Sequence, residues 1–508
     1  MAQIIICGGI TEVPYWRPIG IYQIANVLRQ KGYTVQVVDS FPWLVYRDFD
    51  KLLAIFEKYV DKDTLWIGFG STWFYRIENF LNAGPRAGGS DGFMTNNAKD
   101  KLTVIKENTR LLTLEEIDKL KKLVYAKNPN IKFVMGGARA FSGRRCFATP
   151  LMDCYIEGFA DNTVIEYTEY LAGKRKDIQH IVNEDKSISI THDHKGEGFD
   201  FVNDNFTWHK DDIIHPGEML PIETARGCIF SCAFCSYPLN GRKKLDYLKD
   251  SNVLYRQFME NYEKYGITDY FFTEDTFNDS PQKIRILHDE VISKLPFKIT
   301  FSSYMRIDLL NAHRDTIPLL YNMGVRSVMF GIESMNYEAN KTVGKGIRKD
   351  KILEIGEILK KEWPETVLYS SYIIGLPNDG EEEITQWLEE ICDPSFAFDI
   401  SAVYQLVLDK WQHKKNIWQS KFTMNPEKYG YTFPKSDNSF YWVNNKGLSL
   451  DDAIRIRNTY NKSHIKKKAR RLFGHNDFVK EFSGPGGLDR RLQFVDKYMD
   501  TLLANVQN

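Results

Sequence analysis

The stretch Ala225–Lys243, ARGCIFSCAFCSYPLNGRK, contains three of the seven cysteines of the chain. Cys228, Cys232 and Cys235 have the spacing C-x3-C-x2-C and follow a short run with strand-like composition. Thiolates are the soft ligands that iron–sulfur clusters and zinc ions take from proteins. Because the spacing lets three sulfurs of one loop converge, the stretch predicts a metal centre.

Three thiols suit some kinds of metal centre better than others. A structural zinc ion normally takes four Cys or His ligands, and no fourth Cys or His lies between Gly241 and Leu287. A redox-active pair needs only two thiols, and three small apolar side chains can also fall together by chance. A 4Fe–4S cluster held by three cysteines, with one iron left open, accounts for the number three. We follow this hypothesis, with zinc and a chance triple as the alternatives.

The segment from about 216 to 400 predicts alternating strands and helices with a repeat of roughly 30 to 45 residues. Strands are expected at 221–224, 269–273, 298–303, 327–331 and 367–374, and helices at 253–264, 281–295, 315–322 and 349–361. This repeat fits a β/α barrel or part of one, and we expect a partial (β/α)6 barrel. Such barrels carry their functional residues at the carboxyl ends of the strands.

The first 175 residues alternate in a similar way and predict a parallel, doubly wound, Rossmann-like sheet. Strands are expected at 3–7, 33–38, 64–70, 131–135 and 154–156, and helices at 19–30 and 114–125. Ligands of such sheets bind at the carboxyl ends of the strands. Those ends carry Gly8–Gly9, Ser71–Thr72, Gly136–Gly137 and Glu157–Gly158, which form the candidate binding edge.

Three further segments complete the expected organisation. Residues 84–100 interrupt the N-terminal pattern and indicate an inserted loop. Residues 176–215 are polar and indicate a hairpin and linker, and residues 401–508 indicate a mainly helical C-terminal region. We therefore expect an α/β protein with domains at 1–175 and 216–400.

The amino-acid composition argues against some classes of binding partner. The 508 residues contain 67 Lys and Arg and 67 Asp and Glu, so no basic field argues for nucleic acid or an anionic membrane. The one dense basic run, Lys466–Arg471, is more typical of a solvated helix face than of an RNA contact. No signal peptide or membrane-spanning run is recognisable. The odd number of cysteines in a long chain favours a reducing, cytoplasmic setting.

The cysteine spacing, with Phe234 directly before the last cysteine, resembles the radical S-adenosylmethionine (SAM) superfamily. Four later segments resemble its strand ends in the same order: FFTEDTF (271–277), SSYMRID (302–308), FGIES (330–334) and YIIGLP (372–377). The resemblance implies that Cys228, Cys232 and Cys235 hold a 4Fe–4S cluster whose open iron binds SAM. It implies SAM contacts from Phe234, Tyr237, Glu274, Ser303, Arg306, Glu333 and Gly375.

The N-terminal segments resemble the cobalamin-binding domain found in one branch of that superfamily. The resemblance implies cobalamin contacts from Gly8, Gly9, Gly20, Ser71, Thr72, Gly136, Gly137, Glu157 and Gly158. Glu157–Ala160 reads EGFA where the branch usually has GEGE, which is a departure. The D-x-H-x-x-G motif is absent, and no histidine precedes His180, so no histidine of this domain would ligate cobalt. An empty domain that retains the fold is the alternative.

The resemblance implies cleavage of SAM to a 5′-deoxyadenosyl radical and cobalamin-dependent methyl transfer to an unactivated carbon. It implies a small-molecule or natural-product substrate and an external electron donor of the flavodoxin or ferredoxin type. The alternatives are a radical oxidation, cyclisation or rearrangement without methyl transfer and, more remotely, a non-catalytic iron–sulfur protein. No residue of the chain is predicted to be catalytic in its own right.

Overall fold

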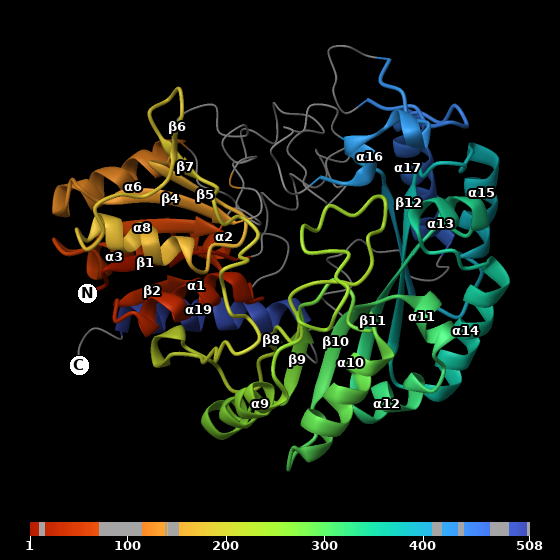
Figure 1. The fold of residues 1–508 in the computed structure, drawn as a ribbon, viewed down its shortest axis with the longest axis horizontal. Helices are drawn as coiled ribbons and strands as arrows, with labels where there is room; N and C mark the ends of the chain where they lie inside the picture. Colours follow the sequence, from red (N-terminus) through yellow and green to blue (C-terminus); the bar gives the residue numbers. More distant parts are fainter. Residues whose placement is uncertain are drawn as a thin grey trace.

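The computed structural model describes residues 1–9, 16–70, 114–137, 140, 152–408, 419–434, 441–467 and 487–504. Two sheets, each covered by helices, form two halves of the molecule (Figure 1). The N-terminal half carries a seven-stranded sheet, and the second half carries a six-stranded sheet. The predicted limits at 175, 215 and 400 remain predictions.

The N-terminal sheet has the strand order β2-β1-β3-β4-β5-β7-β6. Its strands are β1 (Ile4–Cys7), β2 (Val35–Val38), β3 (Trp66–Gly70), β4 (Lys132–Gly137), β5 (Cys154–Glu157), β6 (Ile181–Val182) and β7 (Ile188–Ile190). The first five pair in parallel, which confirms the predicted doubly wound sheet. The order reverses between β1 and β3, and such a switch point is where open parallel sheets bind ligands.

Helices cover both faces of this sheet because its strands are apolar on both faces. They are α1 (Ile19–Gln30), α2 (Phe41–Arg47), α3 (Phe49–Tyr59), α6 (Leu114–Lys127) and α8 (Thr163–Leu171). α1 and α8 pack on one face, and α3 and α6 pack on the other. The predicted hairpin after α8 extends the sheet, because β7 pairs in parallel with β5 and β6 pairs antiparallel with β7.

The second sheet has the order β13-β12-β11-β10-β9-β8, and all its neighbouring strands are parallel. Its strands are β8 (Leu220–Ile222), β9 (Asp269–Phe272), β10 (Thr300–Met305), β11 (Val325–Glu333), β12 (Val367–Ile374) and β13 (Ile400–Gln405). Among the described residues β8 does not pair with β13, so the six strands form the predicted partial barrel. Strand β13 was not among the strands expected from the sequence.

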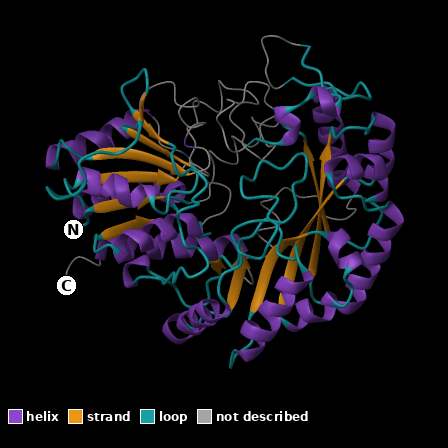
Figure 2. Cartoon of the chain, viewed as in Figure 1, coloured by secondary structure: helices purple, strands orange, loops and turns teal. Residues whose placement is uncertain are grey.

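Helices lie on the outer side of the curved sheet (Figure 2). They are α9 (Ser251–Tyr265), α10 (Pro281–Ile286), α11 (Ile307–Ala312), α12 (Thr316–Asn322), α13 (Tyr337–Val343), α14 (Lys349–Glu362) and α15 (Glu381–Glu390). Alternate strand residues, such as Tyr270 and Phe272, pack toward these helices. Phe271, Met329 and Tyr369 pack on the inner face, where they meet Trp16 of the N-terminal half.

The C-terminal region returns to both halves. It contains α16 (Lys421–Met424), α17 (Leu450–Lys467) and α19 (Gly487–Ala504). α17 packs on β13 and α15, whereas α19 packs on α2 and α3, so the last helix lies against the N-terminal half (Figure 1). None of the described helices is long and apolar enough to cross a bilayer.

Candidate active site

The three cysteines lie in one loop, Arg226–Arg242, between β8 and α9; we call it the cysteine loop. It folds back on itself, because the Gly241 amide donates to the Phe230 carbonyl at 2.9 Å and the Arg242 amide donates to the Cys228 carbonyl at 3.0 Å. Cys228 is buried, and the other two cysteines are partly exposed. The loop therefore presents its thiols beside the carboxyl end of β8.

A buried ion pair supports the first half of the cysteine loop. The Asp279 carboxylate accepts from the Tyr247 hydroxyl at 2.6 Å and from the Ile229 amide at 3.3 Å. Lys283 Nζ lies 3.3 Å from the same carboxylate, and both charged side chains are fully buried. Because a buried charge is costly unless paired, this arrangement fixes the backbone next to Cys228.

Arg306 lies directly against the second cysteine. Its NH1 atom is 3.1 Å from Cys232 Sγ, and its remaining donors contact the Asp308 carboxylate and the Gly344 carbonyl. The guanidinium carbon also lies 4.0 Å from the centroid of the Phe230 ring. Arg306 thus places a fixed positive charge beside Cys232, where a cluster with thiolate ligands would carry negative charge. These contacts engage Arg306 with the protein, and the contact with SAM that the resemblance implies for Arg306 stays a prediction.

The thiols fit a cluster better than a single metal ion. Burial raises the pKa of Cys228, and burial together with Asp275 raises the pKa of Cys235 to about 12. Binding of a metal must therefore release protons from these thiols. Within the described part of the chain, no three Cys, His, Asp or Glu side chains gather closely enough for one metal ion. A 4Fe–4S cubane takes each thiolate on a different iron, so three spread thiols suit it.

Glu274, a predicted SAM contact, holds the start of the cysteine loop. One carboxylate oxygen accepts from the amides of Thr224, at 2.5 Å, and Ala225, at 2.9 Å. The other oxygen is buried and has no hydrogen-bond partner among the described residues. The next residue, Asp275, is accessible, yet surrounding protein and the Glu274 charge raise its pKa to about 6. The charge of Asp275 acts on Cys235, so this exposed carboxylate lies near the motif, and it was not among the site residues predicted from the sequence.

Glu333 and Lys345 form a second polar group near the motif. Glu333 has a φ of 71°, at a bulge of β11, and such left-handed backbone in a non-glycine residue is a strained feature typical of functional sites. Its carboxylate pairs with Lys345 Nζ at 2.6 Å. Lys345 Nζ also lies 5.9 Å from the ring centroid of Phe234, the aromatic residue of the motif.

Two other predicted SAM contacts lie in less open positions. In β10, Ser303 alternates with Tyr304 and shares the face of Met305, which packs toward the helices, so the structure does not bring Ser303 to the inner face. Gly375 has a φ of 103°, and a Cβ atom there would lie 2.1 Å from the Trp442 ring. Trp442 thus fills the space beside Gly375, whose carbonyl accepts from the Tyr431 hydroxyl at 2.9 Å.

The predicted cobalamin edge is partly described. Glycine is required at Gly9, because its φ is 143° and a Cβ atom would lie 2.7 Å from Ser40 Cα. At the end of β5, Glu157 is buried, and its Oε1 atom has no hydrogen-bond partner among the described residues. Burial raises the pKa of this carboxyl, and His194 opposes the shift. An orphaned buried acceptor at this edge fits a bound ligand.

The remaining predicted cobalamin residues differ in their surroundings. Gly8, Gly136, Gly137 and Gly158 lie at or directly after the carboxyl ends of β1, β4 and β5. Gly20 lies in the first turn of α1, where a Cβ atom would meet nothing within 4 Å. Ser71 and Thr72 lie outside the described residues. The Trp16 ring packs edge-on against the Phe271 ring, with 4.9 Å between the ring centroids.

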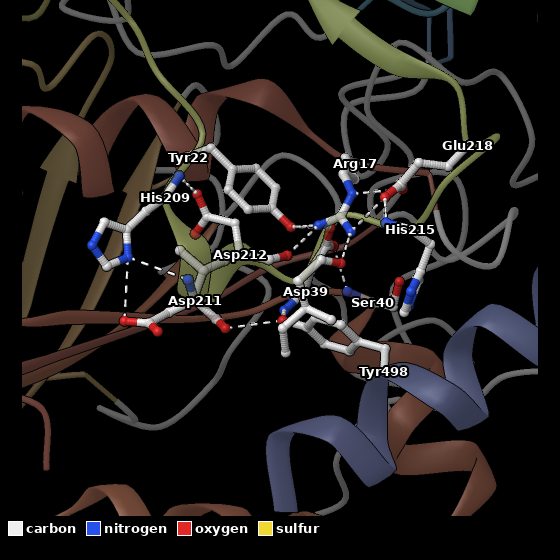
Figure 3. Close-up of polar contacts among 12 residues, drawn as sticks. Arg17, Tyr22, Asp39, Ser40, His209, Asp211, Asp212, His215, Glu218 and Tyr498 are labelled. Atoms are coloured by element: carbon white, nitrogen blue, oxygen red, sulfur yellow. Dashed lines mark hydrogen bonds and ion pairs between the residues drawn. The ribbon is translucent and has the colours of Figure 1, made fainter. Parts of the chain in front are cut away.

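Asp39, at the end of β2, takes part in a buried junction between distant segments (Figure 3). Arg17 Nε donates to the Glu218 carboxylate at 2.8 Å, and its NH2 atom donates to the Ile213 carbonyl at 2.8 Å. The Tyr22 hydroxyl, which accepts from Arg17, donates to Asp39 at 2.6 Å. We call this group the Arg17 junction. The Arg17 junction includes Asp39, which lies where nucleotide-binding sheets often carry an acidic residue that hydrogen-bonds a ribose.

The last helix closes the Arg17 junction. The Tyr498 hydroxyl of α19 accepts from the Asp39 amide at 3.0 Å and donates to the Val37 carbonyl at 2.9 Å. Burial raises the pKa of Asp39 to about 6, against the opposing effect of Arg17. The junction thus links α1, the end of β2, the linker and the C-terminal helix.

Comparison with known proteins agrees with this geometry. The model of the radical SAM superfamily matches residues 222–391. A protein of Pyrococcus horikoshii, described as uncharacterized methyltransferase PH0819, is 25% identical over 277 residues. That match covers 51% of this chain and 57% of the relative, so the chain spans little more than half the length of this curated relative.

Solved structures share the arrangement of both halves. The radical SAM methyltransferase TsrM from Kitasatospora setae, with cobalamin and a [4Fe–4S] cluster bound, matches with a TM-score of 0.59 and 12% identity over 99% of each chain. The cobalamin-dependent SAM radical enzyme OxsB matches with a TM-score of 0.50 and 13% identity, over 93% of this chain and 62% of OxsB. Residues 222–391 therefore constitute a radical SAM domain, set in a chain that shares its two-sheet fold with these enzymes.

Proposed function

We propose that this protein is a cobalamin-dependent radical SAM enzyme that transfers a methyl group to an unactivated carbon of a small molecule. The observation that carries the proposal is the position of the cysteine loop. One of its three thiols, that of Cys232, contacts Arg306 on one side, and its flanks meet the loop after β5 of the N-terminal sheet on the other. A cluster held by the cysteines and a cofactor bound at the end of β5 would therefore lie close to each other.

In this proposal Cys228, Cys232 and Cys235 hold the 4Fe–4S cluster, and Arg306 offsets its negative charge. Asp275 and the Glu333–Lys345 pair lie near the motif, and we assign them to the polar groups of SAM. The orphaned oxygen of Glu157 accepts a hydrogen bond from cobalamin. When bound, the cluster and SAM supply reductive cleavage of the sulfonium, and cobalamin supplies a methyl carrier.

The comparisons support methyl transfer through similarity alone. TsrM is described as a methyltransferase, and one of its structures contains tryptophan as substrate. At 12 to 13% identity such a likeness establishes a fold, so the activity and the small-molecule substrate remain our proposal for this chain. We further propose a flavodoxin or ferredoxin type of electron donor and a reducing cytoplasmic setting. None of the described cysteines forms a disulfide bond, in keeping with that setting.

A second outcome of the same radical chemistry has one observation in its favour. OxsB, whose fold covers 93% of this chain, is described as a cobalamin-dependent radical enzyme without mention of methyl transfer. Radical oxidation, cyclisation or rearrangement is therefore the alternative function.

Anaerobic reconstitution of the purified protein tests the radical part of the proposal. We expect about four iron and four sulfide per chain, and 5′-deoxyadenosine when SAM and dithionite are added. Cys232→Ala should lose both. Cys392→Ala, which alters a buried cysteine next to Tyr460, should retain both. A wild-type protein without cluster or 5′-deoxyadenosine, or a fully active Cys232→Ala variant, would contradict the proposal.

A further inference from the structure

Arg226 lies two residues before the first cysteine and joins the two halves of the molecule. Its NH1 atom donates to Asp161 Oδ2 at 2.9 Å, and Asp161 follows β5 in the N-terminal half. Its Nε and NH2 atoms donate to the two oxygens of Glu223, each at 2.9 Å, so that pair is bidentate. All three side chains are largely buried. The guanidinium therefore has a fixed plane as well as a fixed position.

Three phenylalanines surround the same guanidinium. Its central carbon lies 5.3 Å from the ring centroid of Phe159, 5.4 Å from that of Phe199 and 4.7 Å from that of Phe201. Aromatic faces attract a planar cation, and more strongly where water is excluded. Phe159 belongs to the loop after β5, whereas the other two belong to the linker. Arg226 thus gathers three separate segments around one charge.

The loop after β5, Gly158–Asp161, touches the cysteine loop at both ends of the motif. Asp161 binds Arg226 before Cys228, and the Phe159 ring meets the Tyr237 ring edge-on at 6.5 Å, after Cys235. Phe159 is also part of the EGFA sequence that departs from the usual GEGE. A large aromatic residue there provides contacts that glycine or glutamate would not provide.

The loop after β5 is also held from behind. The Gly158 amide donates to the Gly137 carbonyl at 3.2 Å, and the Phe159 amide donates to the His194 carbonyl at 2.9 Å. A Cβ atom at Gly158 would lie 2.0 Å from that His194 oxygen, so only glycine allows the backbone to approach His194 this closely. A displacement at Arg226 would therefore move the predicted cobalamin edge, at Glu157, relative to the cysteines.

We propose that Arg226 is a positioning residue that sets the distance and orientation between the cobalamin edge and the cysteine loop. The proposal rests on the proposed function, because it assumes a cofactor at each of the two places. Lysine would keep the charge but lose the bidentate fork and the flat face that packs on the phenylalanines. Arg226→Lys should therefore keep the fold and loosen this geometry.

Hydrogen exchange, measured by mass spectrometry, tests the contacts of Arg226 in the protein as purified. In Arg226→Lys we expect exchange of residues 157–162 and 223–230 to rise together, by about tenfold. Asp161→Asn, which removes the charge from the opposite side, should produce the same paired rise. Arg326→Lys is the matched control, since Arg326 pairs with Asp269 at 2.8 Å at the other end of the barrel strands. A rise confined to 223–230, or no rise, would overturn the proposal.

An electron paramagnetic resonance spectrum distinguishes positioning from a merely structural role. In protein loaded with cob(II)alamin and a reduced cluster, we expect a spin–spin splitting that changes in Arg226→Lys and is unchanged in Arg326→Lys. If Arg226→Lys binds both cofactors normally and its splitting equals that of wild type, the positioning role of Arg226 is overturned, while the proposed function stands. A wild-type protein that binds no cobalamin instead overturns the cobalamin part of the proposed function, and the positioning role with it.

Discussion

Two buried arginines join the halves of this molecule, and their surroundings differ. Arg17 lies among phenols, backbone carbonyls and the carboxylate of Glu218, and it links segments up to 201 residues apart in sequence. Arg226 lies among three phenylalanines and two carboxylates, two residues from the first cysteine. The same kind of side chain thus joins the chain at two places with different surroundings.

The two groups of contacts therefore have different roles: that of Arg17 stabilises the fold, and that of Arg226 positions the two parts of the site. The Arg17 junction touches the linker and α19, and none of its described contacts belongs to the cysteine loop. Arg226, by contrast, is the first residue of that loop, and its contacts with Asp161 and Glu223 therefore act on the loop directly. We therefore expect changes at Arg17 to alter stability, and changes at Arg226 to alter the relation between the two halves of the site.

Arg17→Met should have the largest effect on stability. Removal of one partner from a buried ion pair leaves Glu218 and Asp39 without compensation, which typically costs about 3 to 5 kcal/mol. Urea unfolding, monitored separately in each half by hydrogen exchange, should show the loss in the N-terminal half. Per folded molecule, 5′-deoxyadenosine formation should equal that of wild type. Unchanged stability would contradict the assignment of this junction as structural.

Asp39→Asn should remove a pH dependence from the same junction. Burial raises the pKa of Asp39 from 3.8 to about 6 despite Arg17, with Tyr22, Tyr498 and Glu218 also facing it. A raised pKa in the folded state means that its stabilising contribution is complete below about pH 4 and is lost as the pH rises through about 6. At about 1.4 kcal/mol per pKa unit the change is about 3 kcal/mol.

The measurement is the free energy of unfolding of both proteins between pH 4 and pH 7. Relative to wild type, Asp39→Asn should gain stability as the pH rises across this range. A constant difference between the two proteins would show that Asp39 has an ordinary pKa.

Tyr498→Phe should have a smaller effect, because it removes one hydroxyl and keeps the ring. The variant leaves the Asp39 amide and the Val37 carbonyl buried without their partner, at a cost of about 1 to 2 kcal/mol. Tyr170→Phe, at an exposed position of α8, is the control and should change stability by less than about 0.5 kcal/mol. Equal effects in the two variants would argue against a role of α19 in closing the junction.

Arg226→Lys should have the smallest effect on stability, about 1 kcal/mol, since the cation is retained. Thermal unfolding of Arg226→Lys and Arg326→Lys should therefore be similar, while the hydrogen exchange of 157–162 differs. A stability loss as large as that of Arg17→Met would remove the distinction between the two junctions.

The sequence alone indicated the parts of the site whose signals are local. The cysteine spacing and the strand ends lie within short segments, so the metal centre and the partial barrel were predictable. The partners of Arg226 and Arg17 were not, because Asp161 is 65 residues from Arg226 and Glu218 is 201 residues from Arg17. Only tertiary packing brings such residues together.

The same reason explains the remaining differences. Segment 271–277 was recognised by its resemblance to a strand end, but only the structure shows that Glu274 accepts from backbone amides while Asp275 is exposed. A mainly helical C-terminal region was predicted, but the return of its last helix, α19, to α2 and α3 depends on the fold of the whole chain. Strand β13 begins directly at the expected boundary at 400.

The fate of the SAM methyl group tests the central claim most directly. Protein loaded with cluster and cobalamin is incubated anaerobically with SAM carrying a deuterated methyl group and a reductant. We predict S-adenosylhomocysteine and deuterated methylcobalamin, together with 5′-deoxyadenosine. Formation of 5′-deoxyadenosine alone, with the bound cobalamin unmethylated, would contradict methyl transfer and favour another radical outcome.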